Sequence, residues 1–145
     1  MRLLALLGCL VMPACATLRP PSVPTDTVAL SSVHRLFLGD FGSQESSSLV
    51  KEKVRLLLLN STRFQLVERE ELADAVLTGS VGVSHSLEDG TSSYSGSGLL
   101  RLVRRSDGRT IWAHQHRASL TLTASASSRV ANQMVAQLHE AAAVP

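Results

Sequence analysis

The stretch "LLRLVRRSDGRTIWAHQHRASLTLT", residues 99–123, contains the strongest secondary-structure signal of the chain. Leu99–Arg105 and Thr110–Thr123 are both rich in apolar and β-branched residues, which favours β-strands. Between them, Asp107-Gly108 is a dipeptide typical of a tight turn. The stretch therefore predicts an antiparallel β-hairpin, which the rest of the chain has to cover.

Three further strands are predicted upstream, at 33–38, Arg63–Glu68 and Ala75–His85. In the last of these, apolar residues alternate with small ones, which is typical of a strand that packs one face under helices. Residues 69–73 predict one helical turn. The residues at 86–98 are rich in Gly and Ser and predict a loop with Tyr94 at its tip.

Two amphipathic helices complete the prediction, at Ser48–Asn60 and 127–142, because each has apolar residues along one side. The predicted order is β-α-β-β-β-β-α. Both helices most simply cover the same face of the sheet. We therefore expect an α+β fold, a two-layer sandwich with a mixed sheet of about five strands and two helices on one face. It forms one domain over residues 31–142.

The N-terminal residues 1–14 are predicted to be a signal peptide. Met1-Arg2 carries one positive charge, and the ten residues that follow carry none. A transmembrane helix needs roughly 20 apolar residues, and this run is shorter and ends at Pro13. The segment is expected to direct export rather than to span a membrane.

Cys15 is the predicted lipidation site, because Met12-Pro13-Ala14-Cys15 resembles a bacterial lipobox, although Pro13 is atypical of it. Its acyl chains (palmitate) would anchor the protein to a membrane. No Asp follows Cys15, which in lipoproteins favours the outer membrane, with the domain in the periplasm. Two alternatives remain: Ala14-Cys15-Ala16 also fits ordinary signal peptidase, and Leu6–Cys9 fits the lipobox by its letters.

Composition excludes several classes of function. No cysteine follows Cys15, so the folded part has no disulfide, Cys-based zinc site or thiol nucleophile. Residues 1–14 hold one of the 14 basic residues, and the remaining 13 nearly balance the 12 acidic ones. That balance argues against nucleic acid as a partner. Residues 15–30, with three prolines in Ala16–Thr27, predict a tether behind the lipidated cysteine.

No cluster of residues predicts catalysis, so we expect no enzymatic activity, no cofactor and no metal. His114 and His116 share one face of a strand, as metal ligands can, but no spacing supplies a third ligand. The better interpretation is that both are exposed histidines without a metal ion. The carboxylates between Glu68 and Asp74 fit a solvated helical turn better than acid–base work. Trp112 is expected to be a core residue.

Five residues are candidates for contacts with a partner. Tyr94 is one. The others are the arginines around the predicted hairpin, which can bind phosphate groups if they gather there: Arg101, Arg104, Arg105 and Arg109. The alternative for these arginines is a solvated hairpin tip.

Several motifs resemble those of small bacterial envelope lipoprotein domains. These are Arg63-Phe64 with Val67 and Arg69, Ala73-Asp74 with Leu77 and Gly79, and Leu102-Val103 with Asp107-Gly108 and Trp112. The order is similar to that in curli-secretion lipoproteins, in the amino-terminal domain of the Tol-system propeller protein and in lipopolysaccharide-assembly lipoproteins. The long insertion of the curli pore is missing.

The resemblance implies an accessory or assembly role without enzymatic activity. We expect a lipid-anchored envelope protein whose domain binds another envelope component, with sheet edges and residues 86–98 as the contact surface. The alternative is a lipopolysaccharide-assembly type of lipoprotein that binds a glycolipid and an outer-membrane barrel.

Overall fold

The structure is a computed structural model that describes residues 25–88, 90–120 and 123–143. Five strands form one mixed sheet in the order β2-β1-β3-β4-β5, in which β1 lies parallel to β2 and β3, and the other pairs are antiparallel. The elements are α1 (Thr27–Ser31), β1 (Arg35–Leu38), α2 (Glu45–Leu59), β2 (Gln65–Leu66), the 3₁₀ turn η1 (Glu70–Leu72), β3 (Ala75–Glu88), β4 (Thr91–Arg104), β5 (Thr110–Leu120) and α3 (Thr123–Ala143).

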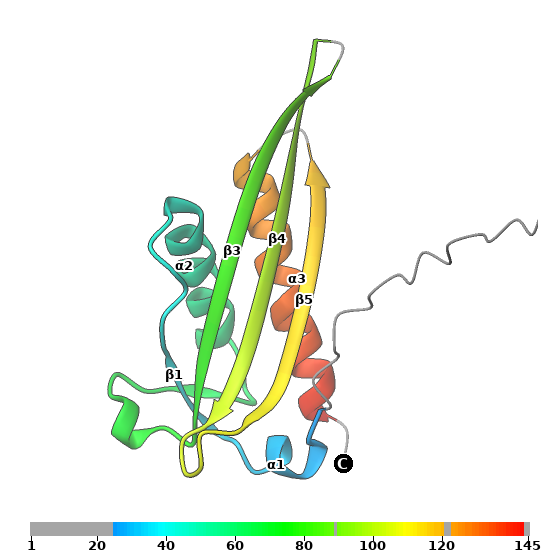
Figure 1. Ribbon diagram of the computed structural model, residues 1–145. Helices are drawn as coiled ribbons and strands as arrows, with labels where there is room; N and C mark the ends of the chain where they lie inside the picture. Colours follow the sequence, from blue (N-terminus) through cyan, green and yellow to red (C-terminus); the bar gives the residue numbers. More distant parts are fainter. Residues whose placement is uncertain (1–24, 89, 121–122, 144–145) are drawn as a thin grey trace, which may run out of the picture.

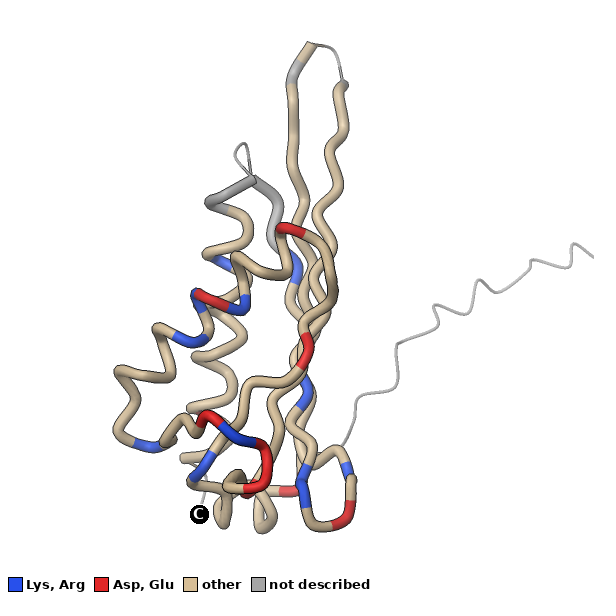
Figure 2. The backbone as a smooth tube through the Cα atoms, turned by 90° about the vertical axis from the view of Figure 1, so that its left-hand side faces the viewer, with Lys and Arg blue, Asp and Glu red and all other residues tan. Residues whose placement is uncertain are grey.

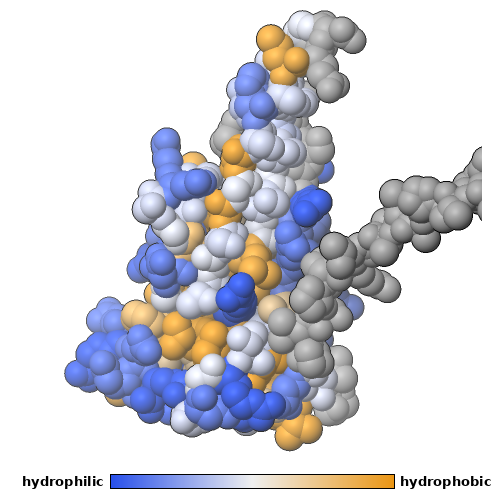
Figure 3. Space-filling view, in the orientation of Figure 1, coloured by the Kyte–Doolittle hydropathy of each residue, from blue (hydrophilic) through white to orange (hydrophobic). Residues whose placement is uncertain are grey.

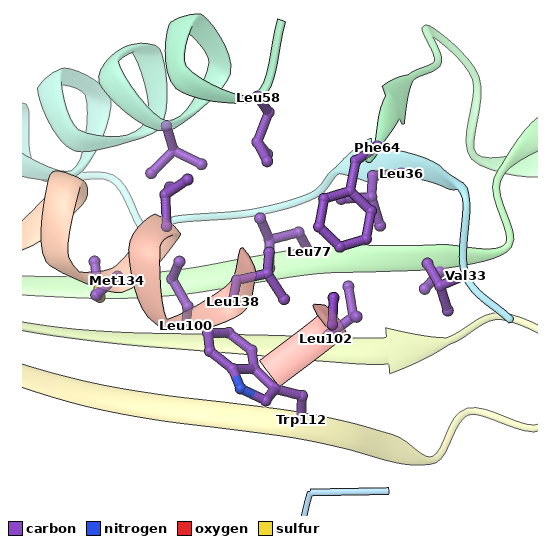
Figure 4. Packing of buried hydrophobic residues seen from close by; sticks show 14 of the residues in the cluster. Val33, Leu36, Leu58, Phe64, Leu77, Leu100, Leu102, Trp112, Met134 and Leu138 are labelled. Atoms are coloured by element: carbon purple, nitrogen blue, oxygen red, sulfur yellow. The ribbon is translucent and has the colours of Figure 1, made fainter. Parts of the chain in front are cut away.

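Helices α2 and α3 pack against each other and cover one face of the sheet, while the other face carries no helix in the described part of the chain (Figure 1). The core lies between these two layers (Figure 4). Trp112 is 3% exposed and belongs to this core, as predicted. The predicted α+β sandwich is therefore confirmed. Its buried residues include Leu36, Leu77, Leu100 and Leu102 from the sheet and Leu58, Met134 and Leu138 from the helices.

The prediction of a loop at residues 86–98 is wrong. β3 and β4 instead form one long antiparallel hairpin, paired from Ala75 opposite Arg104 to Glu88 opposite Thr91. Ser and Gly have weak strand preferences, but pairing with the neighbouring strand overrides them. The turn uses Gly90, whose φ of 77° lies in the left-handed region that glycine adopts without strain.

The element boundaries differ from the predicted ones by a few residues. α2 begins at Glu45 rather than Ser48, and α3 begins at Thr123 rather than at 127. β2 is reduced to Gln65–Leu66, because Phe64 turns into the core at 4% exposure instead of continuing the strand. Asn60 ends α2, as expected for a helix cap, and its amide donates to the carbonyl of Leu56.

A short helix, α1, lies in the segment expected to be the end of the tether. Asp26 caps it by accepting a hydrogen bond from the Ala29 amide at 2.9 Å, and both Ala29 and Leu30 are buried. The packed domain thus begins by residue 26. Cys9, Cys15 and most of the predicted tether lie outside the described residues. No helix in the described ranges is long and apolar enough to cross a membrane.

Candidate binding surface

The outer edge of β3 is free of any neighbouring strand over most of its length. β1 pairs with β3 only from Ala75 to Leu77. From Ser80 to Glu88, the described residues place no strand beside this edge, while β4 occupies the other side (Figure 1). The hairpin formed by β3 and β4 extends beyond both helices. The sheet thus presents a long open edge of the kind that accepts an added strand.

Two hydrogen bonds identify which backbone groups point to the free edge. The carbonyl of Leu77 accepts from the Gly39 amide, and the Gly79 amide donates to the Asp40 carbonyl, both at 2.9 Å. Alternate residues of a strand direct their N–H and C=O groups to the same side. The groups that face outward beyond Gly79 therefore belong to Val81, Val83, His85 and Leu87.

This edge lacks the usual protection against strand pairing. Natural edges are blocked by charged side chains, by proline, by bulges or by covering elements. Residues 80–87 and 90–100 contain no Asp, Glu, Lys, Arg or Pro, and Figure 2 shows the charged residues gathered toward the other end of the domain. The pairing of β3 with β4 is continuous, without a bulge. Val81 is only 8% exposed, so the part of this edge that is accessible to a second strand runs from Val83 to Leu87.

The two faces of this hairpin differ. On the face without helices, serine hydroxyls pair across the strands, with 2.6 Å between the Oγ atoms of Ser84 and Ser95 and the same distance for a second pair. On the other face, the rings of His85 and Tyr94 lie 4.7 Å apart, and Leu87 is 66% exposed. Tyr94 lies within β4, half-buried, and not at a loop tip as predicted.

The predicted arginines do not form one cluster, because two of them have structural partners. Arg104 pairs with the Asp107 carboxylate across the β4–β5 turn, with a distance of 3.0 Å from Nε to Oδ1. This hydrogen bond lowers the pKa of Asp107 to about 2. Arg105 donates from Nε to the Ala73 carbonyl at 3.0 Å. Arg104 thus stabilises the β4–β5 turn, and Arg105 attaches the end of β4 to the segment before β3.

The other two arginines lie apart from each other. Arg109 lies in the exposed turn, where its backbone amide donates to the Asp107 carboxylate. Arg101 lies on the face of the sheet without helices, where it lines a shallow hollow of about 160 Å³ with Thr78, Ser80 and Leu99. Arg101 and Arg109 are therefore separated, because Arg101 lies within β4 whereas Arg109 lies in the turn beyond the end of that strand.

His114 and His116 lie on the helix side of β5, opposite Leu100 and Gly98 of β4. The His114 ring stacks on Trp112, with 6.2 Å between ring centres. Burial lowers the pKa of His114, and the positive charge of His116 lowers it further. Among the described residues, no group of three or more His, Cys, Asp and Glu side chains is arranged to hold a metal ion.

Asp74, one of the residues that carry the resemblance, joins β1 to β3. One carboxylate oxygen accepts hydrogen bonds from the backbone amides of His34 and Arg35, at 3.0 and 2.8 Å. The other accepts from the Arg35 guanidinium at 2.8 Å. Desolvation raises the pKa of Asp74, but these hydrogen bonds outweigh it and lower the pKa to about 2. The role of Asp74 is structural.

Arg63 has a similar structural role at the end of α1. Its guanidinium donates to the carbonyls of Leu30, Ser31 and Val33 at 3.2, 2.9 and 2.7 Å. These carbonyls lie at the C-terminal end of the helix and in the segment that follows it, where intrahelical donors are lacking. The Arg63-Phe64 step of the motif thus attaches α1 to the sheet layer and fixes the position of β2.

The sequence analysis expected sheet edges as a contact surface but missed the long β3–β4 hairpin, whose outer edge is that of β3. Its signal was present, because Asp89-Gly90 is a second hairpin dipeptide. The residues on both sides continue the period-two alternation, in the form Val83, His85, Leu87 against serines. The many serines and glycines of residues 86–98 favoured a loop prediction and concealed this alternation.

No known protein family and no curated protein matches the sequence. Solved structures do match the fold. The hypothetical protein CT253 from Chlamydia trachomatis superposes with a TM-score of 0.62 at 12% identity, over 77% of this chain and 99% of that one. A minor lipoprotein from Acinetobacter baumannii has a TM-score of 0.56 at 11% identity, over 74% and 94%.

A third similar structure is a dodecamer of a PelC variant from Paraburkholderia phytofirmans, with a TM-score of 0.57 at 11% identity, over 81% of this chain and 93% of that one. At such low identity these likenesses show a common fold. Several of the proteins that share this fold are lipoproteins, which is consistent with the general resemblance. The matches do not support the specific curli-secretion, Tol or lipopolysaccharide-assembly groups.

Proposed function

We propose that this protein is a non-enzymatic envelope lipoprotein, anchored through Cys15 to the periplasmic face of the outer membrane, whose domain binds another envelope protein. The lipobox-like residues before Cys15 and the fold similarity to lipoproteins support the anchor. Residues 16–24 link the anchor to the packed domain, which begins by Asp26. An anchored domain of this kind serves to hold or to assemble a partner at the membrane.

The free edge of β3 is the observation that carries the proposal. It offers the backbone donors and acceptors of Val83, His85 and Leu87, without charge or proline to repel a strand. Strand addition at such an edge supplies affinity through main-chain hydrogen bonds. Specificity then comes from the side chains beside the edge, with His85, Leu87 and Tyr94 on one face of the hairpin and paired serines on the other.

The alternative, a glycolipid-binding role of the lipopolysaccharide-assembly type, has less support. It relied on four arginines gathered around one hairpin, and Arg104 and Arg105 are already engaged by Asp107 and the Ala73 carbonyl. Only Arg109 of the turn has its guanidinium exposed without a recorded partner in the described residues. An extended strand edge fits a protein partner better than a glycolipid.

Affinity purification of the tagged chain from detergent-solubilised envelopes tests both parts of the proposal. The N-terminal peptide of the mature protein is analysed by mass spectrometry, together with the proteins that co-purify. We expect a mature chain that begins at acylated Cys15 and a specific envelope protein at near-equal amounts. A mature chain that begins at Thr17 without acyl mass contradicts the anchor, and recovery of lipid without any protein contradicts the partner.

A further inference from the structure

The attachment of α1 to the rest of the domain rests on a small set of contacts. Two buried side chains, Ala29 and Leu30, pack against α3 and β5 (Figure 1). The Asp26 amide donates to the Ile111 carbonyl of β5 at 2.9 Å. The end of α1 is held by a further contact, the guanidinium of Arg63. A short helix attached in this way can open locally while the rest of the domain stays folded.

Arg63 closes the C-terminal end of α1. Its Nη2 atom donates to the carbonyls of Leu30 and Ser31, and its Nη1 atom donates to the carbonyl of Val33. Hydrogen bonds from a charged donor are stronger than those between neutral groups. Because the last carbonyls of a helix have no intrahelical donor, these bonds also satisfy groups that would otherwise need water. Any change that displaces the guanidinium therefore weakens the hold on α1.

The ring of His34 belongs to the same contact. Its Nδ1 atom lies 3.0 Å from the Nη1 atom of Arg63. A guanidinium can only donate, so this contact is a hydrogen bond only while Nδ1 carries no proton. Protonation of the ring turns Nδ1 into a donor and places two positive charges side by side. His34 is exposed, and many hydrophilic residues gather at the lower end of the molecule, where α1 lies (Figure 3), so protons from the solvent reach the ring.

A second histidine, His139 of α3, is linked to Arg63 through the ring of Phe64. The Cζ atom of Arg63 lies 5.0 Å from the centre of the Phe64 ring, and the Phe64 and His139 rings meet edge to face with 5.5 Å between their centres. Burial lowers the pKa of His139, and the positive charge of Arg63 lowers it further. The stability that the neutral ring contributes is therefore complete above the ordinary pKa of 6.5 and is lost as the pH falls below it.

The carboxylates beside the two histidines already have other partners. Asp74 accepts from the backbone amide of His34, and its carboxylate pairs with the Arg35 guanidinium at 2.8 Å. Glu140, the next residue after the second histidine, accepts from the Gln137 amide at 2.9 Å. Protonation of both rings therefore brings two further positive charges near a guanidinium, and these charges repel it.

We propose that His34 and His139 make the Arg63 contact an acid-sensitive clasp, which holds α1 on the domain at neutral pH and releases it at mildly acidic pH. On release, the residues from Asp26 to His34 join the tether, and they can span roughly 30 Å when extended. An anchored domain then reaches further from the membrane. This consequence rests on the proposed anchor at Cys15, whereas the release of α1 does not.

Hydrogen–deuterium exchange of the full exported chain in detergent, at about pH 7.5 and about pH 5, tests the clasp. The reporters are the amides of Leu30 and Val33, which donate to the carbonyls of Asp26 and Leu30. After correction for intrinsic exchange, we expect their protection to fall roughly tenfold at the lower pH, while Val54 and Leu58 of α2 stay protected. Unchanged protection of α1 overturns the proposal, as does an equal loss in α2, because the opening is then global.

His34→Asn/His139→Phe is the decisive variant. Asn keeps an acceptor near the position of Nδ1, and Phe keeps a ring against Phe64, but neither side chain gains a proton. The α1 amides of this variant should stay protected at about pH 5, and each single variant should keep part of the pH effect. His85→Asn, on the distant β3–β4 hairpin, is the matched control and should open like the parent.

A double variant that loses α1 protection as the parent does would overturn the proposal, because other groups would then be responsible for the opening. The exchange measurement gives the same information whether or not Cys15 carries acyl chains. A chain without the anchor therefore leaves the clasp standing, and a clasp that fails leaves the anchor and the free edge of β3 standing.

Discussion

Gly79 of β3 lies directly against the ring of Phe41, and a Cβ atom at Gly79 would be 2.6 Å from Cδ1 of that ring. Phe41 is 1% exposed and follows β1, so its ring fills the space that a side chain on β3 would otherwise occupy. The glycine that the motif comparison singled out is thus required for close packing between the segment after β1 and the centre of β3.

Gly79→Ala is expected to lower the free energy of unfolding by about 1 to 3 kcal/mol, because the buried ring has to move. Gly82→Ala on the same strand is the matched control. Its Cβ would meet only Ser97 Oγ, at 3.4 Å, on the face of the sheet without helices, so its effect should stay within about 0.5 kcal/mol. Urea unfolding followed by circular dichroism measures both. Equal effects would contradict the packing role of Gly79.

Asp74→Asn should lower the free energy of unfolding at pH 7 by about 1 to 2 kcal/mol, because the pair with Arg35 is partly screened by water. The folded-state pKa of about 2 lies below the ordinary aspartate value of 3.8. The stabilisation is therefore complete above about pH 4 and is lost as the pH falls toward 2. The stability difference between the parent and Asp74→Asn should shrink over that range in urea titrations. A difference that is constant from pH 7 to pH 2 would show that the charge of Asp74 is unimportant.

Arg105→Ala is expected to destabilise the domain by about 1 kcal/mol, because it removes the hydrogen bond to the Ala73 carbonyl. Arg101→Ala should change stability by less than about 0.5 kcal/mol, because its exposed side chain has no recorded partner in the described residues. Thermal unfolding of the two variants provides the comparison. A larger loss of stability for Arg101→Ala than for Arg105→Ala would contradict these structural roles.

Trp112→Phe should cost less stability than Trp112→Ala, for which about 3 to 5 kcal/mol is expected from the loss of a buried ring. The stacked His114 ring should become more exposed in the alanine variant, and its lowered pKa should move back up toward the ordinary histidine value. Chemical denaturation measures the stability, and NMR titration of the histidine ring protons measures the pKa. An unchanged His114 pKa would mean that Trp112 does not shield it.

The fold class and the order of elements from β1 to α3 followed from the sequence, because local patterns determined them, whereas α1 was not predicted. The Asp107-Gly108 turn, with Gly108 at a φ of 69°, and the two amphipathic helices were sufficient for that. The extension of β3 and β4 through residues 86–98 could not be predicted from propensity, since serine and glycine gain strand structure only through pairing with a neighbour.

The candidate site was harder to predict, because it depends on what is absent beside a strand. Whether the edge of β3 is free depends on how far β1 runs, and β1 is only four residues long. The separation of Arg101 from Arg104 and Arg105 depends on the pleat and on partners distant in sequence, such as the Ala73 carbonyl.

The most direct test of strand addition at β3 compares His85→Pro with His85→Ala in co-purification of the envelope partner. Proline removes the outward N–H of residue 85 but keeps the β4 pairing, which uses the neighbouring residues, and proline is tolerated on edge strands. Alanine removes the ring but keeps the N–H. We predict that the partner is lost with His85→Pro and retained with His85→Ala, with both variants folded. Full recovery of the partner with His85→Pro would contradict binding at this edge.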